Sequence, residues 1–145
     1  MHHSIVYIST PTFAPSQAAG MVRAIVGHAQ RRNADRGVTG TLIATEHHFA
    51  QVIEGRRDAT QPLMENILLD PRHCDVTIVQ HQIDAGRRFR EWSLAYHGNS
   101  AYFEGFIRAL LPGREQRRGD VERLVDLMTR LAQPQPRRPV RDDRP

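Results

Sequence analysis

Three residues of this chain have side chains suited to binding chemistry: Gln51, Tyr7 and Asn33. Residues 48–54 have the pattern of a short strand followed by a glycine. The two-residue period of a strand places Gln51 on the same face as Phe49 and Ile53. A buried amide without a partner costs on the order of 1–3 kcal/mol. Because an amide can both donate and accept hydrogen bonds, we expect Gln51 to meet a ligand with hydrogen-bonding edges.

Tyr7 and Asn33 come from other elements of the same predicted core. Tyr7 shares a strand face with Ile5, and this face is the one from which Gln51 should also project. Asn33 lies near the end of a predicted helix. Considered alone, Tyr7 would be an ordinary core residue and Asn33 a helix C-cap.

The elements that must position these residues follow from the hydrophobic pattern. Strands are predicted at residues 4–9, 39–45, 48–54, 76–83 and 92–96, and helices from Ser16 to the segment 31–37 and at about residues 58–69. The order βαββαββ predicts an α+β, ferredoxin-like sandwich with both helices on one face of the sheet.

The chain beyond residue 97 is predicted to form a separate helical cap. Amphipathic helices are expected at residues 102–111 and 120–132, where they would cover the sheet face left bare by the first two helices. Domain boundaries are therefore expected at 1–97, 98–132 and 133–145, the last a disordered basic tail. The cap carries an apolar stripe, which either packs on the sheet or supports a homo-oligomer: Phe103, Phe106, Ile107 and Leu110.

Composition narrows the classes of function. The 145 residues are 39% apolar, which suits a compact domain, and the sequence shows neither a membrane-spanning apolar run nor a cleavable signal. The single cysteine, Cys74, fits a reducing cytoplasm. The net charge is +4, and all basic residues are arginines. These arginines are scattered and aromatic content is only 6%, which disfavours nucleic-acid binding.

Five ordered segments give the chain a specific resemblance. These are residues 5–9, residues 33–40 with Asn33 and Gly-Val-Thr-Gly, residues 49–55, residues 70–73 with Asp-Pro-Arg-His, and residues 89–94 with Phe-Arg-Glu-Trp-Ser-Leu. Together they resemble the BLUF domain, a blue-light sensor that holds a flavin between two helices of a ferredoxin-like sheet. The resemblance covers about the first 97 residues.

The resemblance implies a role for each matching residue. Tyr7 would be the reversible electron and proton donor to photoexcited flavin, and Gln51 the amide that then rearranges its hydrogen bonds. Trp92 and Leu94 would relay the change. The remaining positions would bind the flavin, FAD or possibly FMN, without a covalent bond: Ile25 and Ile67 around the ring, Asn33 at its edge, and Arg72 and His73 beside the second helix.

Three residues depart from the family pattern. Arg32 stands where a second asparagine is common, and Leu94 stands where methionine is usual. Asn66 replaces an arginine that faces the flavin phosphates in many members. This replacement leaves open whether the flavin is FAD or FMN. None of these departures removes the pair formed by Tyr7 and Gln51.

We interpret the chain as a short blue-light receptor without enzymatic activity, which signals to a downstream protein partner. One alternative is a photochemically silent BLUF-like interaction module. Another is a small ferredoxin-like enzyme, although the sequence offers no nucleophile–base pair or paired catalytic carboxylates. A metal site at His2, His3, His47 and His48 is disfavoured, because adjacent histidines on a strand point in opposite directions.

Overall fold

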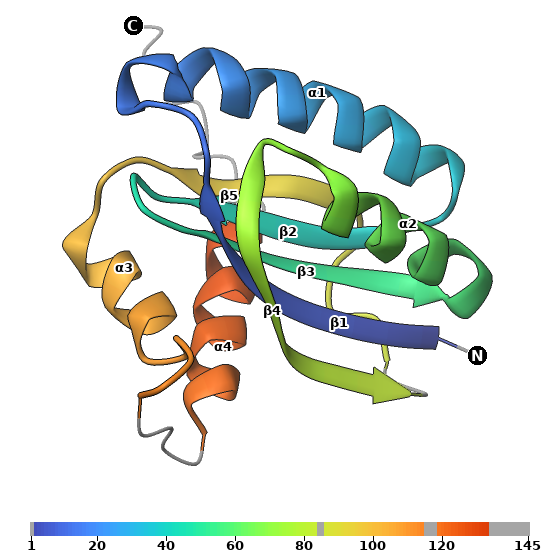
Figure 1. Ribbon diagram of the computed structural model, residues 1–145. Helices are drawn as coiled ribbons and strands as arrows, with labels where there is room; N and C mark the ends of the chain where they lie inside the picture. Colours follow the sequence, from blue (N-terminus) through green and yellow to red (C-terminus); the bar gives the residue numbers. More distant parts are fainter. Residues whose placement is uncertain (1, 84–85, 115–118, 134–145) are drawn as a thin grey trace, which may run out of the picture.

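The computed structural model describes residues 2–83, 86–114 and 119–133, in which a five-stranded sheet carries helices on both faces (Figure 1). The strands are β1 (His2–Pro11), β2 (Thr39–Ala44), β3 (Phe49–Arg56), β4 (His73–Ile83) and β5 (Trp92–His97). The helices are a 3-10 turn η1 (Pro15–Gln17), then α1 (Ala18–Asp35), α2 (Arg57–Leu69), α3 (Ala101–Arg108) and α4 (Asp120–Ala132). The strand order is β4-β1-β3-β2-β5, with β2 and β5 parallel and the other pairs antiparallel. The predicted α+β, ferredoxin-like arrangement is confirmed.

Side-chain alternation along the strands creates two apolar layers. Ile5 and Tyr7 of β1 lie in the cluster that packs under α2, whereas Val6 and Ile8 lie in the cluster that contains residues of α3 and α4. Gln51 is paired opposite Tyr7 across β1 and β3, so both side chains project from the α1–α2 face. The predicted face of Tyr7 and Gln51 is therefore confirmed.

The structure extends β4 beyond its predicted start at residue 76. The strand begins at His73, where it pairs with Pro11 of a longer β1. Asp75 has a positive φ of 53°, and the β1–β4 register shifts nearby. Such a bulge interrupts the period of two, which explains why the alternation in the sequence revealed only the second part of the strand.

The cap helices cover the sheet face opposite α1 and α2, as predicted. Helix α4 has the predicted bounds, whereas α3 ends at Arg108 instead of continuing to residue 111. Leu110 is nevertheless 1% exposed, because tight turns after α3 carry it into the core. The tail predicted for residues 133–145 falls, from residue 134 onward, outside the described residues.

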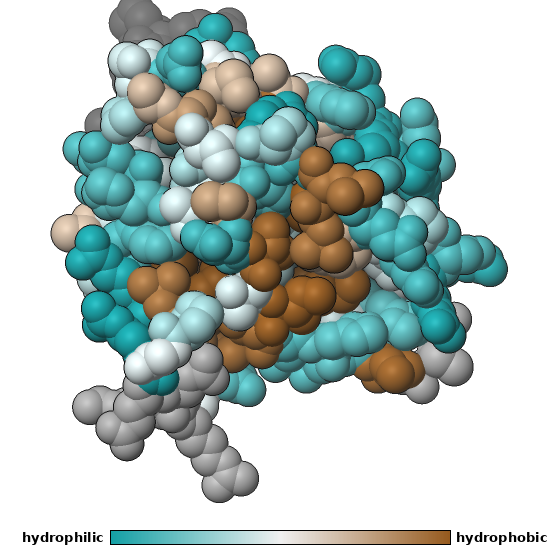
Figure 2. All heavy atoms as spheres, in the orientation of Figure 1, coloured by the Kyte–Doolittle hydropathy of each residue, from teal (hydrophilic) through white to brown (hydrophobic). Residues whose placement is uncertain are grey.

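The apolar stripe of the cap faces inward. Ile107 is fully buried, Phe106 packs against the core, and the Phe103 ring contacts Tyr96 with centroids 4.4 Å apart. The stripe therefore packs on the sheet and gives no support to self-association, which stays a prediction. The large apolar side chains that are exposed are Leu68, Leu69, Ile78, Ile83 and Tyr102. Figure 2 shows apolar surface over β4 and the end of α2.

Two further expectations concern membranes and metals. Among the helices of the described ranges, none has the length and apolar character needed to cross a membrane. The described part of the chain also has no group of three or more histidine, cysteine, aspartate or glutamate side chains placed to hold a metal ion.

Candidate functional site

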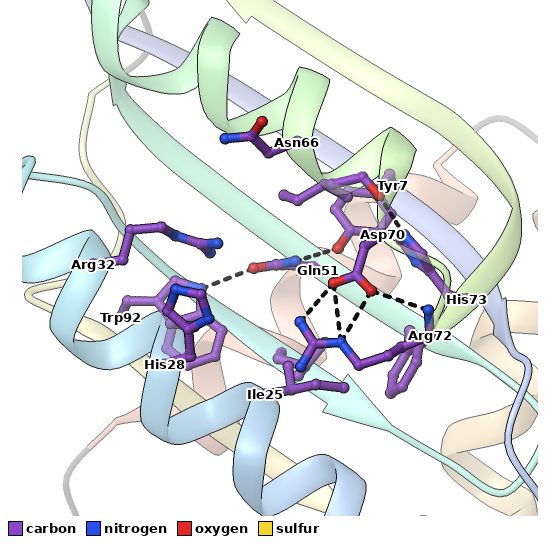
Figure 3. Close-up of a pocket in the computed structure, with 14 residues that line it drawn as sticks. Tyr7, Ile25, His28, Arg32, Gln51, Asn66, Asp70, Arg72, His73 and Trp92 are labelled. Atoms are coloured by element: carbon purple, nitrogen blue, oxygen red, sulfur yellow. Dashed lines mark hydrogen bonds and ion pairs between the residues drawn. The ribbon is translucent and has the colours of Figure 1, made fainter.

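A pocket lies between α1 and α2 above the sheet (Figure 3). The empty space between its walls, part of which is open solvent, amounts to about 580 Å³. Its walls are formed by Tyr7, Ile25, His28, Ala29, Arg32, Leu42, Phe49, Gln51, Asn66, Ile67, Asp70, Arg72, His73 and Trp92. Six of the seven cofactor-binding residues predicted from the sequence are therefore brought together here, and Asn33 is not among the lining residues.

Gln51 bridges the side chains of Tyr7 and Trp92. Its Nε2 donates to the Tyr7 hydroxyl, and its Oε1 accepts from the Trp92 indole Nε1 at 2.9 Å. The indole can only donate, so this contact fixes which end of the amide faces Trp92. Gln51 is only 6% exposed, so its amide is shielded from water. It nevertheless has a hydrogen-bond partner at each end.

Tyr7 is held in its protonated form. Burial raises the pKa of its hydroxyl above the ordinary value, and the hydrogen bond from Gln51 lowers it by less. At neutral pH the phenol therefore keeps its proton, and its oxygen accepts from Gln51.

Asn33 is fully buried within α1. Its Oδ1 accepts from the Arg32 Nε at 3.2 Å, while its Nδ2 is buried with no hydrogen-bond partner in the described residues. The helix end is closed by the backbone carbonyl of Asn33, which accepts from Val38 N at 2.9 Å and Arg36 N at 3.2 Å. The side chain therefore does not act as a C-cap.

Arg72 and His73 line the pocket but have protein partners. Arg72 binds Asp70 through its side chain at 2.6–3.1 Å, and these hydrogen bonds hold the pKa of Asp70 below its usual range. His73 Nε2 lies 2.6 Å from the Ile67 carbonyl, which can only accept, so Nε2 carries a proton. Its Nδ1 lies 2.8 Å from Ser9 Oγ. These contacts fix the positions of both side chains.

Trp92 and Leu94, the two residues predicted to relay the signal, lie on the same face of β5. Trp92 is 5% exposed, and Leu94 is half-buried against the cluster that contains Trp92, Leu42 and Phe49. Leu94 also pairs with Leu42 across the parallel β2–β5 ladder. The structure therefore connects Leu94 to the pocket through apolar contacts alone.

Two polar pocket residues on α1 received no binding role from the sequence. His28 and Arg32 line the pocket together with Ile25 and Ala29. Residues spaced by three, four and seven positions share one face of a helix, so the helical period starting from Ile25 was a signal that could have identified both. Asp70 was also missed as a lining residue, although it belongs to a segment that carried the resemblance.

The chain matches short segments of several longer proteins. The photoactivated adenylate cyclase subunit beta of Euglena gracilis is 40% identical over 93 residues, which are 63% of this chain and 10% of that protein. The chain thus spans about a tenth of the length of the curated relatives of this kind that it matches.

Solved structures agree with the fold and the family. BlrB, a BLUF protein in its dark state, has a TM-score of 0.70 and 29% identity, over 89% of this chain and 96% of that chain. Klebsiella pneumoniae BlrP1 with FMN and cyclic diGMP has a TM-score of 0.59 and 30% identity, over 68% of this chain and 26% of that one. The BLUF family model, described as sensors of blue-light using FAD, matches residues 2–95. By this match over most of its length, the chain belongs to the BLUF family.

Proposed function

We propose that this chain is a blue-light photoreceptor that holds a non-covalent flavin between α1 and α2. The observation that carries the proposal is the buried Gln51 amide, which bonds to Tyr7 at one end and to Trp92 at the other. An amide can exchange its donating and accepting ends. In this position, such an exchange would alter both contacts at once.

The residues of the pocket fit a flavin. Ile25 of α1 and Ile67 of α2 line it with aliphatic surface suited to the two faces of a flat ring. Asn33 is not a lining residue, but it is the neighbour of Arg32, which is. Its buried Nδ2 has no partner in the described part of the chain, so a ring carbonyl that reached it would satisfy a donor that otherwise costs on the order of 1–3 kcal/mol. The pocket thus combines aliphatic and aromatic walls with polar side chains that can fix the orientation of a ligand.

We assign the photochemical roles to Tyr7 and Gln51. A bound flavin would supply a group that absorbs blue light and, when excited, can take up an electron and a proton. The Tyr7 hydroxyl holds the proton that can be given up, and burial keeps it there in the dark. Gln51 donates directly to this hydroxyl. A transient loss of the phenolic proton would therefore change the hydrogen bond that holds the Gln51 amide in its dark orientation.

The flavin is expected to be FAD, as in the description of the family, with FMN as the alternative. Asn66 lines the pocket without a positive charge, which should weaken binding of the flavin phosphates and leaves open whether FAD or FMN is bound. Purified protein should be yellow, and heat should release an unmodified flavin that chromatography identifies. Protein that stays flavin-free after incubation with FAD and with FMN would contradict the proposal.

Signal output is expected to pass from the sheet to the cap formed by residues 98–132. We propose residues 1–97 as the sensing domain and a downstream protein, or a second copy of the chain, as the receiver. We propose that the chain itself acts as a sensor without enzymatic activity. A cytoplasmic location is proposed because Cys74 is free and exposed, as is common in reducing surroundings.

Leu94→Met should enlarge the light-induced change in β5 and in the cap, while the shift in the flavin spectrum stays nearly the same. Leucine can only pack, whereas methionine can accept a weak hydrogen bond and adapt its shape. Hydrogen exchange in dark and light would measure the difference between the native chain and the variant. An equal response in both proteins would show that this position does not limit the relay.

A further inference from the structure

Trp92 keeps its place in the pocket although it begins an edge strand. It is the first residue of β5, which lies at one end of the strand order, and the ends of such strands open more easily than the core of a sheet. Trp92 is nevertheless 5% exposed, and its indole Nε1 donates to the Gln51 amide at 2.9 Å (Figure 3). The segment that precedes Trp92 shows which contacts keep the start of β5 closed.

That segment is bound by one buried carboxylate of β3. Oε1 of Glu54 accepts from Phe89 N at 2.8 Å and from Arg88 N at 3.1 Å, and Oε2 also lies 3.1 Å from Arg88 N. Glu54 is 2% exposed. Hydrogen bonds from backbone amides to a carboxylate are stronger than those between neutral groups, and burial strengthens them further. The backbone is therefore fixed to β3 three and four positions before Trp92.

Contacts with β2 continue this attachment up to the tryptophan. Oε1 of Glu54 also accepts from Thr39 Oγ1 at 2.9 Å, which joins the carboxylate to the first residue of β2. The carbonyl of Glu91 accepts from Gly40 N at 3.1 Å, and Gly40 then pairs with Trp92 in the parallel ladder. The segment is thus attached at both ends, and Trp92 follows the last of these contacts.

We propose that Glu54 is a positioning residue for the Gln51–Trp92 hydrogen bond. By holding residues 88 and 89 against β3, its carboxylate keeps the Trp92 indole in contact with the amide. The inference rests on the proposed function, in which that amide switches. The competing explanation is that the Phe89 side chain, which is 7% exposed in the cluster with the cap helices, is a sufficient anchor by itself.

The test follows the exchange of the Trp92 indole proton with solvent in the full chain, kept in the dark. The chain contains one tryptophan, so its indole N–H gives a single side-chain signal in an NMR spectrum. Glu54→Leu should speed this exchange at least about tenfold, because opening of the segment no longer breaks buried hydrogen bonds. The Arg88 and Phe89 amides should speed up as well, because they lose their acceptor directly.

Conservative and matched variants separate the carboxylate from its surroundings. Glu54→Gln should recover most of the native protection, because its amide oxygen can take the place of Oε1, which accepts from three donors. Glu91→Leu makes the same change as Glu54→Leu at an exposed side chain next to Trp92, and it should leave indole exchange at the native rate. If Glu54→Leu does not fold, Glu54→Asp replaces it, because its shorter side chain draws the carboxylate away from residues 88 and 89.

Low concentrations of urea distinguish positioning from a general loss of stability. Local opening exposes little surface and responds weakly to urea, whereas exchange through global unfolding responds strongly. We expect the weak response for the Trp92 indole in Glu54→Leu and the strong response for buried amides of β1 and β3.

Three results would overturn the inference. The first is native indole exchange beside fast Arg88 and Phe89 amides in Glu54→Leu, which would make the Phe89 side chain the anchor. The second is an indole that follows urea as the core amides do, and the third is native indole exchange in Glu54→Asp where that variant is needed. A chain that shows the expected exchange rates but binds no flavin would overturn the proposed function and leave the role of Glu54 in placing Trp92 intact.

Discussion

Replacing Gln51 with leucine should leave the flavin bound and abolish the light-induced shift of its absorption. Leucine keeps the apolar volume of the glutamine but can neither donate to the Tyr7 hydroxyl nor accept from Trp92 Nε1. The exchange of hydrogen-bonding ends, which we propose as the light response, is then impossible. Absorption spectra before and after blue light measure the effect.

Gln61→Leu is a suitable control, because Gln61 lies on α2 with an exposed side chain and outside the pocket walls. It should respond to light as the native protein does. Tyr7→Phe should also lose normal photocycling, because it removes the phenolic proton while the ring stays in the core. A full and reversible shift in Gln51→Leu or Tyr7→Phe would show that the role assigned to that residue is wrong.

Replacing Glu54 with leucine should produce the largest loss of stability among the changes considered. The Glu54 carboxylate is 2% exposed and accepts from Thr39 Oγ1 at 2.9 Å, Arg88 N at 3.1 Å and Phe89 N at 2.8 Å. It thereby ties the loop between β4 and β5 to the sheet. Loss of this acceptor leaves several donors without a partner, each at about 1–3 kcal/mol.

We therefore expect the free energy of unfolding of Glu54→Leu to fall by about 3–5 kcal/mol, measured by urea denaturation. Glu91→Leu makes the same chemical change at an exposed position of the same loop, and its effect should stay within about 0.5 kcal/mol. A loss below about 1 kcal/mol in Glu54→Leu would mean that water replaces the carboxylate, and that the loop does not depend on it.

Local patterns were sufficient to predict much of the fold and part of the pocket. The period of two on β1 and β3 correctly placed Tyr7, Gln51 and Phe49 on one face, and the amphipathic pattern of residues 120–132 gave the bounds of α4. Patterns of this kind work where burial alone determines which side of an element faces the core. The start of β4 was not predicted correctly, because the positive φ of Asp75 and the shifted register interrupt the alternation of side chains.

Contacts between distant polar residues could not be predicted. His48, considered only as a rejected metal ligand, contacts Glu104 and joins the turn before β3 to α3. Glu54 reaches a loop more than thirty positions away. A single sequence gives the types of such residues but not their partners, because a hydrogen bond between distant segments depends on the completed topology.

The Gln51–Trp92 hydrogen bond is another contact between distant residues that the sequence did not predict. The sequence predicted a polar partner for Gln51 and assigned Trp92 to the relay, and the structure joins the two by a hydrogen bond of 2.9 Å. Trp92 is therefore in direct contact with the amide proposed to switch. A change in the orientation of Gln51 would reach β5 without an intermediate residue.

The most direct test of the central claim is a light-minus-dark absorption spectrum of the purified, flavin-loaded protein. The account predicts a small red shift of the flavin bands under blue light, followed by spontaneous return to the initial spectrum in the dark. Protein that holds oxidised flavin between α1 and α2 but shows no reversible shift would contradict the account and would favour the photochemically silent interaction module.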